Sequence, residues 1–244
     1  MQLFKNRIKF LTTLVLLYVI LFEFVIPANK FFPKPSIIFD SFSDLFSDYN
    51  LLSALFLTTL IILFALFFSY LIIYFLRSQV ISFIKHFPNI IEILNVLRYI
   101  PVFFVPVVLI FIFGANFLTE LIFVFIIAIS FLFYKMNDLQ KKVSDAYIDS
   151  AKSLGVGQLK IYKDIYWKTM EPALTKSIRK LNIYLWSAAL LFEYIAGFFG
   201  LGSVYFQGFM YKDISAVFAL TIIVFVLMAV VDGLIYLIET RTIF

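Results

Sequence analysis

The chain has 244 residues, of which 63% are apolar and 20% aromatic, while only 14% are charged. A mean hydropathy of +1.02 means more apolar surface than a soluble core of this size can bury, so we predict an all-α polytopic membrane protein. The absence of Cys and the single His, His86, exclude disulfides, thiolate centres and His-cluster metal sites, and we expect no enzyme activity.

Six segments are long and apolar enough to cross a hydrocarbon layer of about 30 Å, which takes about 20 helical residues. These segments are 9–27, 51–76, 93–113, 117–134, 173–195 and 214–238. The first has basic residues before it, as a signal peptide does, but no small-x-small cleavage site follows it. We therefore predict that it is retained as a membrane anchor.

The distribution of Lys and Arg predicts the orientation of these segments. With the N-terminus in the cytoplasm, 17 of the 20 Lys and Arg residues fall on the cytoplasmic side, and only Lys30, Lys34 and Lys212 lie outside. Positive residues concentrate in cytoplasmic loops, so both termini are predicted to be cytoplasmic. The net charge of +5 is then explained by topology, and we expect lipid rather than nucleic acid as the partner of this charge.

The loop after the first segment predicts a short helix, 35–47, on the outer membrane surface. Ile38, Phe42 and Leu45 recur at helical spacing, whereas Asp40 and Asp44 fall on the opposite side. No linker or change in composition divides the chain, so residues 1–244 are predicted to form a single transmembrane domain.

The third segment carries two prolines and an arginine. Pro101 and Pro106 are predicted to interrupt its hydrogen-bond ladder. Carbonyls freed inside a membrane need partners or a water-lined cavity, so this segment either faces such a cavity or has kinks that only shape packing. Arg98 lies about one turn inside the segment and either has a function there or extends back to the cytoplasmic surface.

The cytoplasmic loop, 144–170, is the longest polar passage in the chain. Ser144 is expected to cap a first helix, Tyr147, Ala151 and Leu154 are expected to form one apolar stripe on it, and Gly155 is expected to end it. Two short helices about a glycine break either dock on another protein or form a solvated hairpin that connects two spans.

A second helix is predicted after this break. It would present Leu159, Tyr162 and Tyr166 on one face, and Pro172 would mark its change into the fifth segment. Tyr166 and Trp167 are expected to be aromatic anchors at the edge of the membrane.

The fifth segment contains two polar residues at membrane depth. Glu193 lies near its end, before the Gly-Leu-Gly turn at 200–202, and either has a function inside the membrane or reaches the outer interface. Asn182 either forms a hydrogen bond with another helix or faces a cavity.

The loop sequence then resembles a known motif. Asp149-Ser150-Ala151-x3-Gly155, followed after nine residues by Ile165, resembles the E-A-A-x3-G-x9-I-x-L-P loop of the membrane subunits of bacterial binding-protein-dependent ABC importers. Asp replaces Glu, Ser replaces the first Ala, Trp replaces Leu and Lys replaces Pro. Segments 32–36, 97–106 and 193–202 resemble further signatures of that family, in the same order, and the branch resembled includes nitrate, sulfonate, taurine and pyrimidine-precursor permeases.

The resemblance implies the type I ABC importer permease fold, with six transmembrane helices, in the bacterial cytoplasmic (inner) membrane. It implies three protein partners: a cytoplasmic ABC ATPase, a second permease subunit of the same or a different chain, and an extracytoplasmic substrate-binding protein. ATP and Mg would be bound by the ATPase, because this chain has no G-x4-G-K-[ST] loop and is expected to hold no cofactor itself.

The resemblance also assigns roles to residues. The implied ATPase-coupling residues are Asp149, Ser150, Ala151, Leu154, Gly155 and Ile165. The candidates for the translocation path are Glu193, Asn182, Arg98, Pro101 and Pro106. The implied substrate is a small organic or inorganic anion or a vitamin precursor. The alternative function is that of a non-transporting scaffold subunit that docks an ATPase in a larger complex.

Overall fold

The structure, a computed structural model, describes residues 2–26, 31–87 and 101–242, and every regular element in these ranges is a helix. Three helices are long and apolar enough to cross a membrane: α3 (Leu51–Phe75), α7 (Phe117–Gln140) and α12 (Ile214–Thr242). The helix that contains α10 (Trp167–Ala196) and the following α11 (Gly200–Met210) are together apolar enough to count as a fourth span. They are separated by a short break, at which the axis bends by 52°.

Two of the six predicted spans correspond to shorter apolar helices. The first consists of α1 (Gln2–Val19) and a π-helical turn, η1 (Ile20–Val25), and its apolar part is Thr12–Val25. The third is represented by α6 (Phe104–Phe113), which has ten residues. Residues 93–100 of that predicted span lie outside the described residues.

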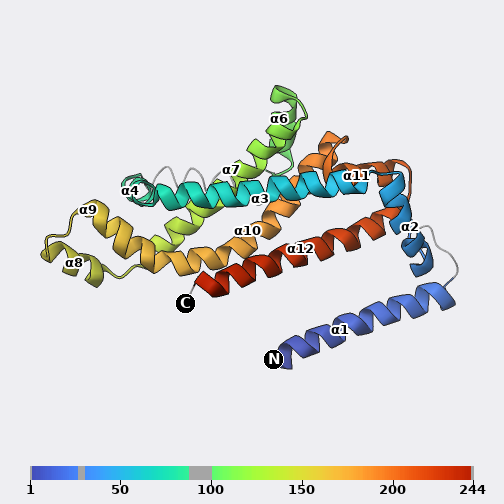
Figure 1. The fold of residues 1–244 in the computed structure, drawn as a ribbon, viewed down its shortest axis with the longest axis horizontal. Helices are drawn as coiled ribbons and strands as arrows, with labels where there is room; N and C mark the ends of the chain where they lie inside the picture. The colour runs from blue at the N-terminus through green and yellow to red at the C-terminus, as the bar shows by residue number, and fades with distance from the viewer. Residues whose placement is uncertain (1, 27–30, 88–100, 243–244) are drawn as a thin grey trace.

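The centre of the molecule is formed by α3, α7 and α10, which pack against one another along their lengths (Figure 1). Their contact faces are mostly apolar, with Ile61, Leu132, Leu185 and Trp186 fully buried. Helix α3 is apolar on all sides, as expected for a helix that faces both protein and lipid. Figure 1 shows α12 running beside α10 and α1 lying to one side of the other helices.

The two ends of α10 lie at opposite ends of the molecule (Figure 1). We call the end at which α10 meets α11 the junction end. The opposite end is called the loop end, because α8 (Asp145–Ser153) and α9 (Gln158–Lys160) project there beside α4 (Arg77–His86).

At the junction end, α2 (Pro35–Ser47) packs against α12. Helix α2 has the same bounds as the predicted surface helix, 35–47. Pro35 occupies its first turn, where a backbone N–H has no partner within the helix and is not needed. Ile38 and Leu45 are buried against the bundle, whereas Asp40 and Asp44 are exposed. The charged side of α2 therefore faces away from the protein.

An ion pair joins α10 to α12. Arg179 Nε and Nη2 donate to the two carboxylate oxygens of Asp232 at 3.0 and 2.5 Å. The guanidinium also lies 5.2 Å from the centroid of the Tyr236 ring. A two-point contact of this kind fixes the relative position of the two helices better than a single hydrogen bond.

The expected boundary at Pro172 is wrong. Helices α9, η3 (Ile161–Tyr166) and α10 are continuous, so one helical rod extends over Gln158–Ala196 with Pro172 inside it. Proline removes the hydrogen bond to the carbonyl of Lys168, but Lys168 is exposed, where other donors can reach its carbonyl. The loop and the fifth predicted span are thus mechanically one element.

Candidate functional site

The loop arm, residues 144–166, leaves the bundle as α8 and turns back into the rod. The turn is a Schellman motif: Val156 N–H donates to Ala151 O at 3.1 Å, and Gly155 N–H donates to Lys152 O at 2.9 Å. Gly155 has a φ of +73°, a left-handed conformation that glycine adopts without steric cost. The helix end predicted at Gly155 is confirmed.

The apolar residues of the loop arm do not form one face. Ile148 and Ala151 are buried, and α8 packs against η3. Tyr147, Leu154 and Leu159 point away from the bundle and are 68%, 82% and 65% exposed. A helix of three turns with one neighbour can bury only a narrow face, so the predicted stripe is divided between a packed side and an uncovered side.

The polar residues of the predicted motif lie on the surface of α8. Asp149 and Ser150 are exposed, and the Asp149 carboxylate lies 3.4 Å from Lys152 Nζ. Ile165, on η3, is partly buried. Ser144 occupies the N-cap position of α8 but makes no side-chain capping hydrogen bond, so the predicted side-chain cap is wrong.

The base of the loop arm is packed with aromatic rings. Tyr166 and Trp167 are only 4% and 3% exposed, so their predicted role as anchors at the membrane edge is wrong. The Trp167 and Tyr74 rings lie edge to face, with their centroids 5.9 Å apart. The Arg77 guanidinium lies 4.6 Å from the Tyr74 ring centroid. These rings turn inward because η3 packs against α4, and they hold the rod in place where it enters the bundle.

At the junction end, Glu193 holds α10, α11 and α3 together. Its side chain is fully buried. One carboxyl oxygen accepts a hydrogen bond from Thr58 Oγ1 at 2.5 Å, and the other accepts one from Gly202 N–H at 2.8 Å. Thr58 Oγ1 in turn accepts from Leu201 N–H at 3.0 Å. Two free N–H groups at the start of α11 are thereby satisfied by side chains from two other helices.

Two glycines make this arrangement possible. A Cβ atom on Gly200 would lie 2.0 Å from the Glu193 carboxyl carbon, and one on Gly202 would lie 2.2 Å from the backbone oxygen of Leu190. Gly200 also has a φ of +72°. Any larger residue at either position would push α11 away from α10.

A second carboxyl group lies beside the first. Glu120, in the first turn of α7, is fully buried and interacts with Glu193. No N–H or O–H group of the described residues donates to Glu120, whose polar neighbour is the Glu193 carboxyl. Two ionised carboxylates would repel each other in an apolar interior, so the pair is an unusual feature of this end of the bundle.

Asn182 lies on the same face of α10 as Glu193, closer to the loop end. It is fully buried, and neither its amide oxygen nor its amide nitrogen has a partner in the described part of the chain. Trp186 Nε1, one turn further along α10, is in the same situation. The predicted hydrogen bond from Asn182 to another helix is therefore not observed among the described residues.

The predicted features of the third span are only partly described. Pro106 lies in the first turn of α6, where no helical hydrogen bond is lost, and Pro101 precedes the helix. The part of the predicted span before Pro101 lies outside the described residues, so the interruption of its hydrogen-bond ladder stays a prediction. Arg98 lies outside the described residues.

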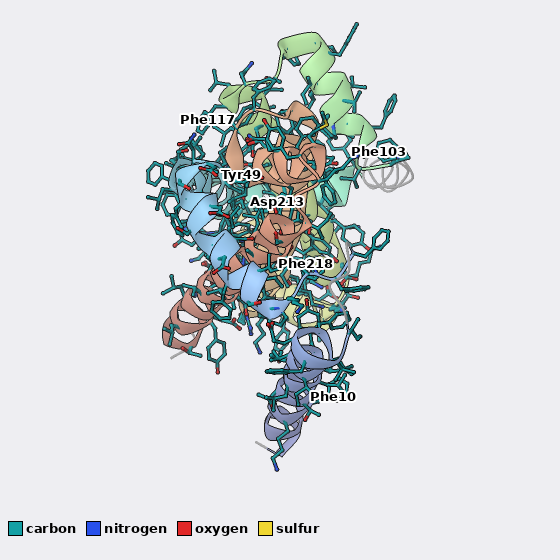
Figure 2. All side chains as sticks on the ribbon, turned by 90° about the vertical axis from the view of Figure 1, so that its right-hand side faces the viewer. Phe10, Tyr49, Phe103, Phe117, Asp213 and Phe218 are labelled. Atoms are coloured by element: carbon teal, nitrogen blue, oxygen red, sulfur yellow. The ribbon has the colours of Figure 1, made fainter. Side chains whose placement is uncertain are left out.

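Several residues of the junction were not found from the sequence. Thr58 and Glu120 are polar residues within apolar helices, a signal that by itself marks candidate sites. Tyr49 donates a hydrogen bond to Asp213 at 3.1 Å across the junction end, and Figure 2 shows these two residues close together. Burial and the adjacent Asp213 carboxylate raise the pKa of Tyr49 to about 12. No local pattern could predict that pair, because 164 residues separate its members.

Comparison with known proteins gives the family. A family model described as the binding-protein-dependent transport system inner membrane component matches residues 90–244, which include the loop arm, the rod and the junction. Searches of curated proteins and of solved structures found no match. The match covers more than half of the sequence, and the chain therefore belongs to the family of inner membrane components of binding-protein-dependent transport systems.

Proposed function

We propose that this chain is the permease subunit of an ATP-driven importer and that the loop arm is where its ATPase docks. The observation that carries the proposal is the uncovered apolar side of the arm, formed by Tyr147, Leu154 and Leu159. The helices that carry these exposed side chains project at the loop end (Figure 1), and a tight turn joins α8 to α9. Exposed aromatic and aliphatic side chains on a rigid element are typical of a protein interface.

The proposed topology has six crossings with both termini in the cytoplasm. The loop end then lies in the cytoplasm, where an ATPase is available, and the junction end lies outside. The excess of Lys and Arg in the segments assigned to the cytoplasm supports this orientation. Segments 9–27 and 93–113 would complete the six crossings together with the four spans counted in the structure.

The proposed partners divide the work of transport. The ATPase binds ATP and Mg and supplies the energy, while this chain and a second permease subunit form the path between them. A substrate-binding protein delivers the transported molecule to the junction end. Lipid surrounds the bundle, no nucleic acid is involved, and this chain carries neither a cofactor nor catalytic residues.

The rod provides a direct mechanical connection between the two ends. It runs over Gln158–Ala196, about 58 Å at 1.5 Å per residue, from the loop arm to the junction. Movement of the arm against the ATPase would displace α10 as a rigid body. At its other end Glu193 ties α10 to α3 and α11, so the displacement reaches the outer mouth of the bundle.

The candidates for the translocation path differ in whether other residues of the chain already occupy their polar atoms. Glu193 is engaged by Thr58 and α11, which favours a positioning role over contact with the transported molecule. Asn182 is buried without a partner among the described residues, so it is the better candidate for the path.

The proposal is tested by purifying the full chain from its native membrane and identifying co-purifying proteins by mass spectrometry. A Tyr147→Ser/Leu154→Ser variant should lose the ATPase, because it removes two of the three uncovered apolar side chains without touching a buried one. The matched control is Met210→Ser/Tyr211→Ser, which removes two exposed side chains at the junction end. It should retain the ATPase.

Three results would contradict the proposal: recovery of no ATPase with the unmodified chain, equal recovery with both variants, or loss with the control alone. Thermal unfolding in detergent should be the same for both variants, which excludes misfolding as the cause of a lost partner.

A further inference from the structure

A pocket of about 240 Å³ opens at the junction end between the start of α3 and the start of α11. Three of its lining residues are aromatic: Tyr49, Phe198 and Phe199. Further lining residues, Asn50 and Gln207 among them, carry neutral polar side chains. The volume suits a small molecule, being below the range of about 300–1,000 Å³ that is usual for drug-sized ligands.

Two carboxyl groups lie next to residues that line this pocket. Gly200 forms part of its wall, and the Glu193 carboxyl lies directly behind that glycine, where a Cβ would be only 2.0 Å away. Asp213 accepts the Tyr49 hydroxyl proton in a hydrogen bond at 3.1 Å, so a second carboxylate stands behind the aromatic wall. No Lys or Arg is among the lining residues that the structure describes.

The wider surface at this end has the same sign. The exposed acids Asp40, Asp44 and Asp48 are carried on α2 and the residue that follows it. The described basic residue nearest to them in sequence is Lys34, and the exposed Lys212 precedes Asp213, so the acids outnumber the bases here. A surface with an excess of carboxylates raises the local concentration of cations and lowers that of anions.

We propose that this pocket receives a small organic ammonium ion, in place of the anion that the sequence resemblance implies. Aromatic faces attract an ammonium group through their quadrupole, and nearby carboxylates add to that attraction without requiring a direct ion pair. Tyr49 keeps its proton engaged with Asp213, so its ring face is what it offers to a ligand. An anion in the pocket would find no Lys or Arg side chain among the described lining residues.

The inference rests on the proposed function, because it treats the pocket as the outer mouth of the permease and so names a substrate class. In this proposal Phe198 and Phe199 select the cation through their aromatic rings, and the carboxyl groups of Glu193 and Asp213, next to the lining residues, add to that preference.

The test uses the full chain in lipid nanodiscs, without an ATPase, and three molecules of nearly the same shape. Choline is the cation, 3,3-dimethyl-1-butanol is its neutral counterpart, and 3,3-dimethylbutanoate is the anion. Binding is followed by saturation-transfer NMR titration. The Kd for choline should be at least about fivefold lower than that for the alcohol, and the anion should bind most weakly.

Two variants connect the result to the pocket. Phe198→Leu removes an exposed ring from the lining and should raise the choline Kd about three- to tenfold. Phe111→Leu is the matched control, because Phe111 is 91% exposed on α6 and does not line the pocket. It should leave the choline Kd unchanged.

The inference is overturned if choline does not bind, if choline and the alcohol bind equally, if the anion binds best, or if Phe198→Leu and Phe111→Leu have the same effect. Its failure is distinguishable from failure of the proposed function. Recovery of the ATPase with the same chain would leave the permease role standing while the ammonium site falls.

Discussion

At the junction end, most buried polar groups have hydrogen-bond partners within the chain. At the loop end, by contrast, large apolar side chains are exposed to solvent. The carboxylate of Glu193 collects donors from α3 and α11 and is fully buried. Tyr147, on α8, and Leu154, which directly follows α8, are more than half exposed, although contact with water is unfavourable for the apolar surface of both side chains.

The difference separates a structural site from a docking site. A group whose requirements are met inside the chain contributes to its own stability, and its removal should damage the protein whether or not a partner is present. A group whose requirements are unmet contributes little to the isolated chain, and its removal should matter only when the partner is bound. Four substitutions test this contrast, beginning with the largest expected effect.

Gly202→Ala should destabilise the chain by about 2–4 kcal/mol, because the added methyl group would lie 2.2 Å from Leu190 O and 2.5 Å from Tyr194 N. Both atoms belong to the backbone and cannot rotate away. Gly233→Ala in α12 is the control, since nothing lies within 4 Å of its added Cβ, and it should be neutral or slightly stabilising. Thermal unfolding in detergent measures both, and equal melting temperatures would show that α11 tolerates a wider spacing.

Glu193→Ala should cost about 1–3 kcal/mol, because the Gly202 N–H loses its buried acceptor, whereas Thr58 can still donate to Ala54 O. Glu193→Gln keeps one oxygen acceptor and should cost about 1 kcal/mol. The same unfolding measurement, combined with a transport assay, distinguishes a structural role of Glu193 in positioning the helices from a role in the translocation path. A Glu193→Ala chain as stable as the parent but inactive in transport would move Glu193 from the structural site to the path.

Gly155→Ala should weaken ATPase binding about fivefold and leave the global melting temperature unchanged. Its φ of +73° costs a residue with a Cβ about 1 kcal/mol, which loosens the end of α8 but no buried contact. Gly157→Ala is the matched control, because Gly157 has a φ of −62° and open space around it. Affinity for the purified ATPase is the readout, and equal losses for the two variants would contradict the importance of the turn.

Tyr49→Phe should have the smallest effect, about 1 kcal/mol of stability, because it removes the single hydrogen bond to Asp213. The pKa of Tyr49 is raised to about 12, so the phenol is neutral and the bond is fully present below about pH 10, and it is lost as the pH rises through about 12. The difference in melting temperature from the parent should thus be constant between about pH 6 and about pH 9. A difference that changes within this range would show that another group controls the contact.

Local sequence signals predicted the helices but not all of their boundaries or partners. Gly155 ends α8 because a left-handed residue is a strictly local requirement. Pro172 did not end a helix, because the lost hydrogen bond falls on an exposed turn. Tyr166 and Trp167 are typical of a membrane edge by residue type, yet packing of η3 against α4 turned them inward.

The candidate site shows the same limit. The motif from Asp149 to Ile165 placed a helix, a glycine turn and a second helix in the correct order. It could not show that Ile148 is buried while Leu154 is exposed, since both are apolar and lie on one short helix. Only the position of η3 decides between them.

The sequence by itself determined that the chain is a helical membrane protein and that a glycine ends α8, because hydropathy, helical period and backbone conformation depend on neighbouring residues. The tertiary structure alone decided that Glu193 is held by Thr58, which lies 135 residues away in the chain, and that Gly200 and Gly202 make room for it. It also decided which side of the loop arm is left uncovered. Burial and hydrogen bonding between distant segments depend on how helices pack, and a local pattern in the sequence does not record that packing.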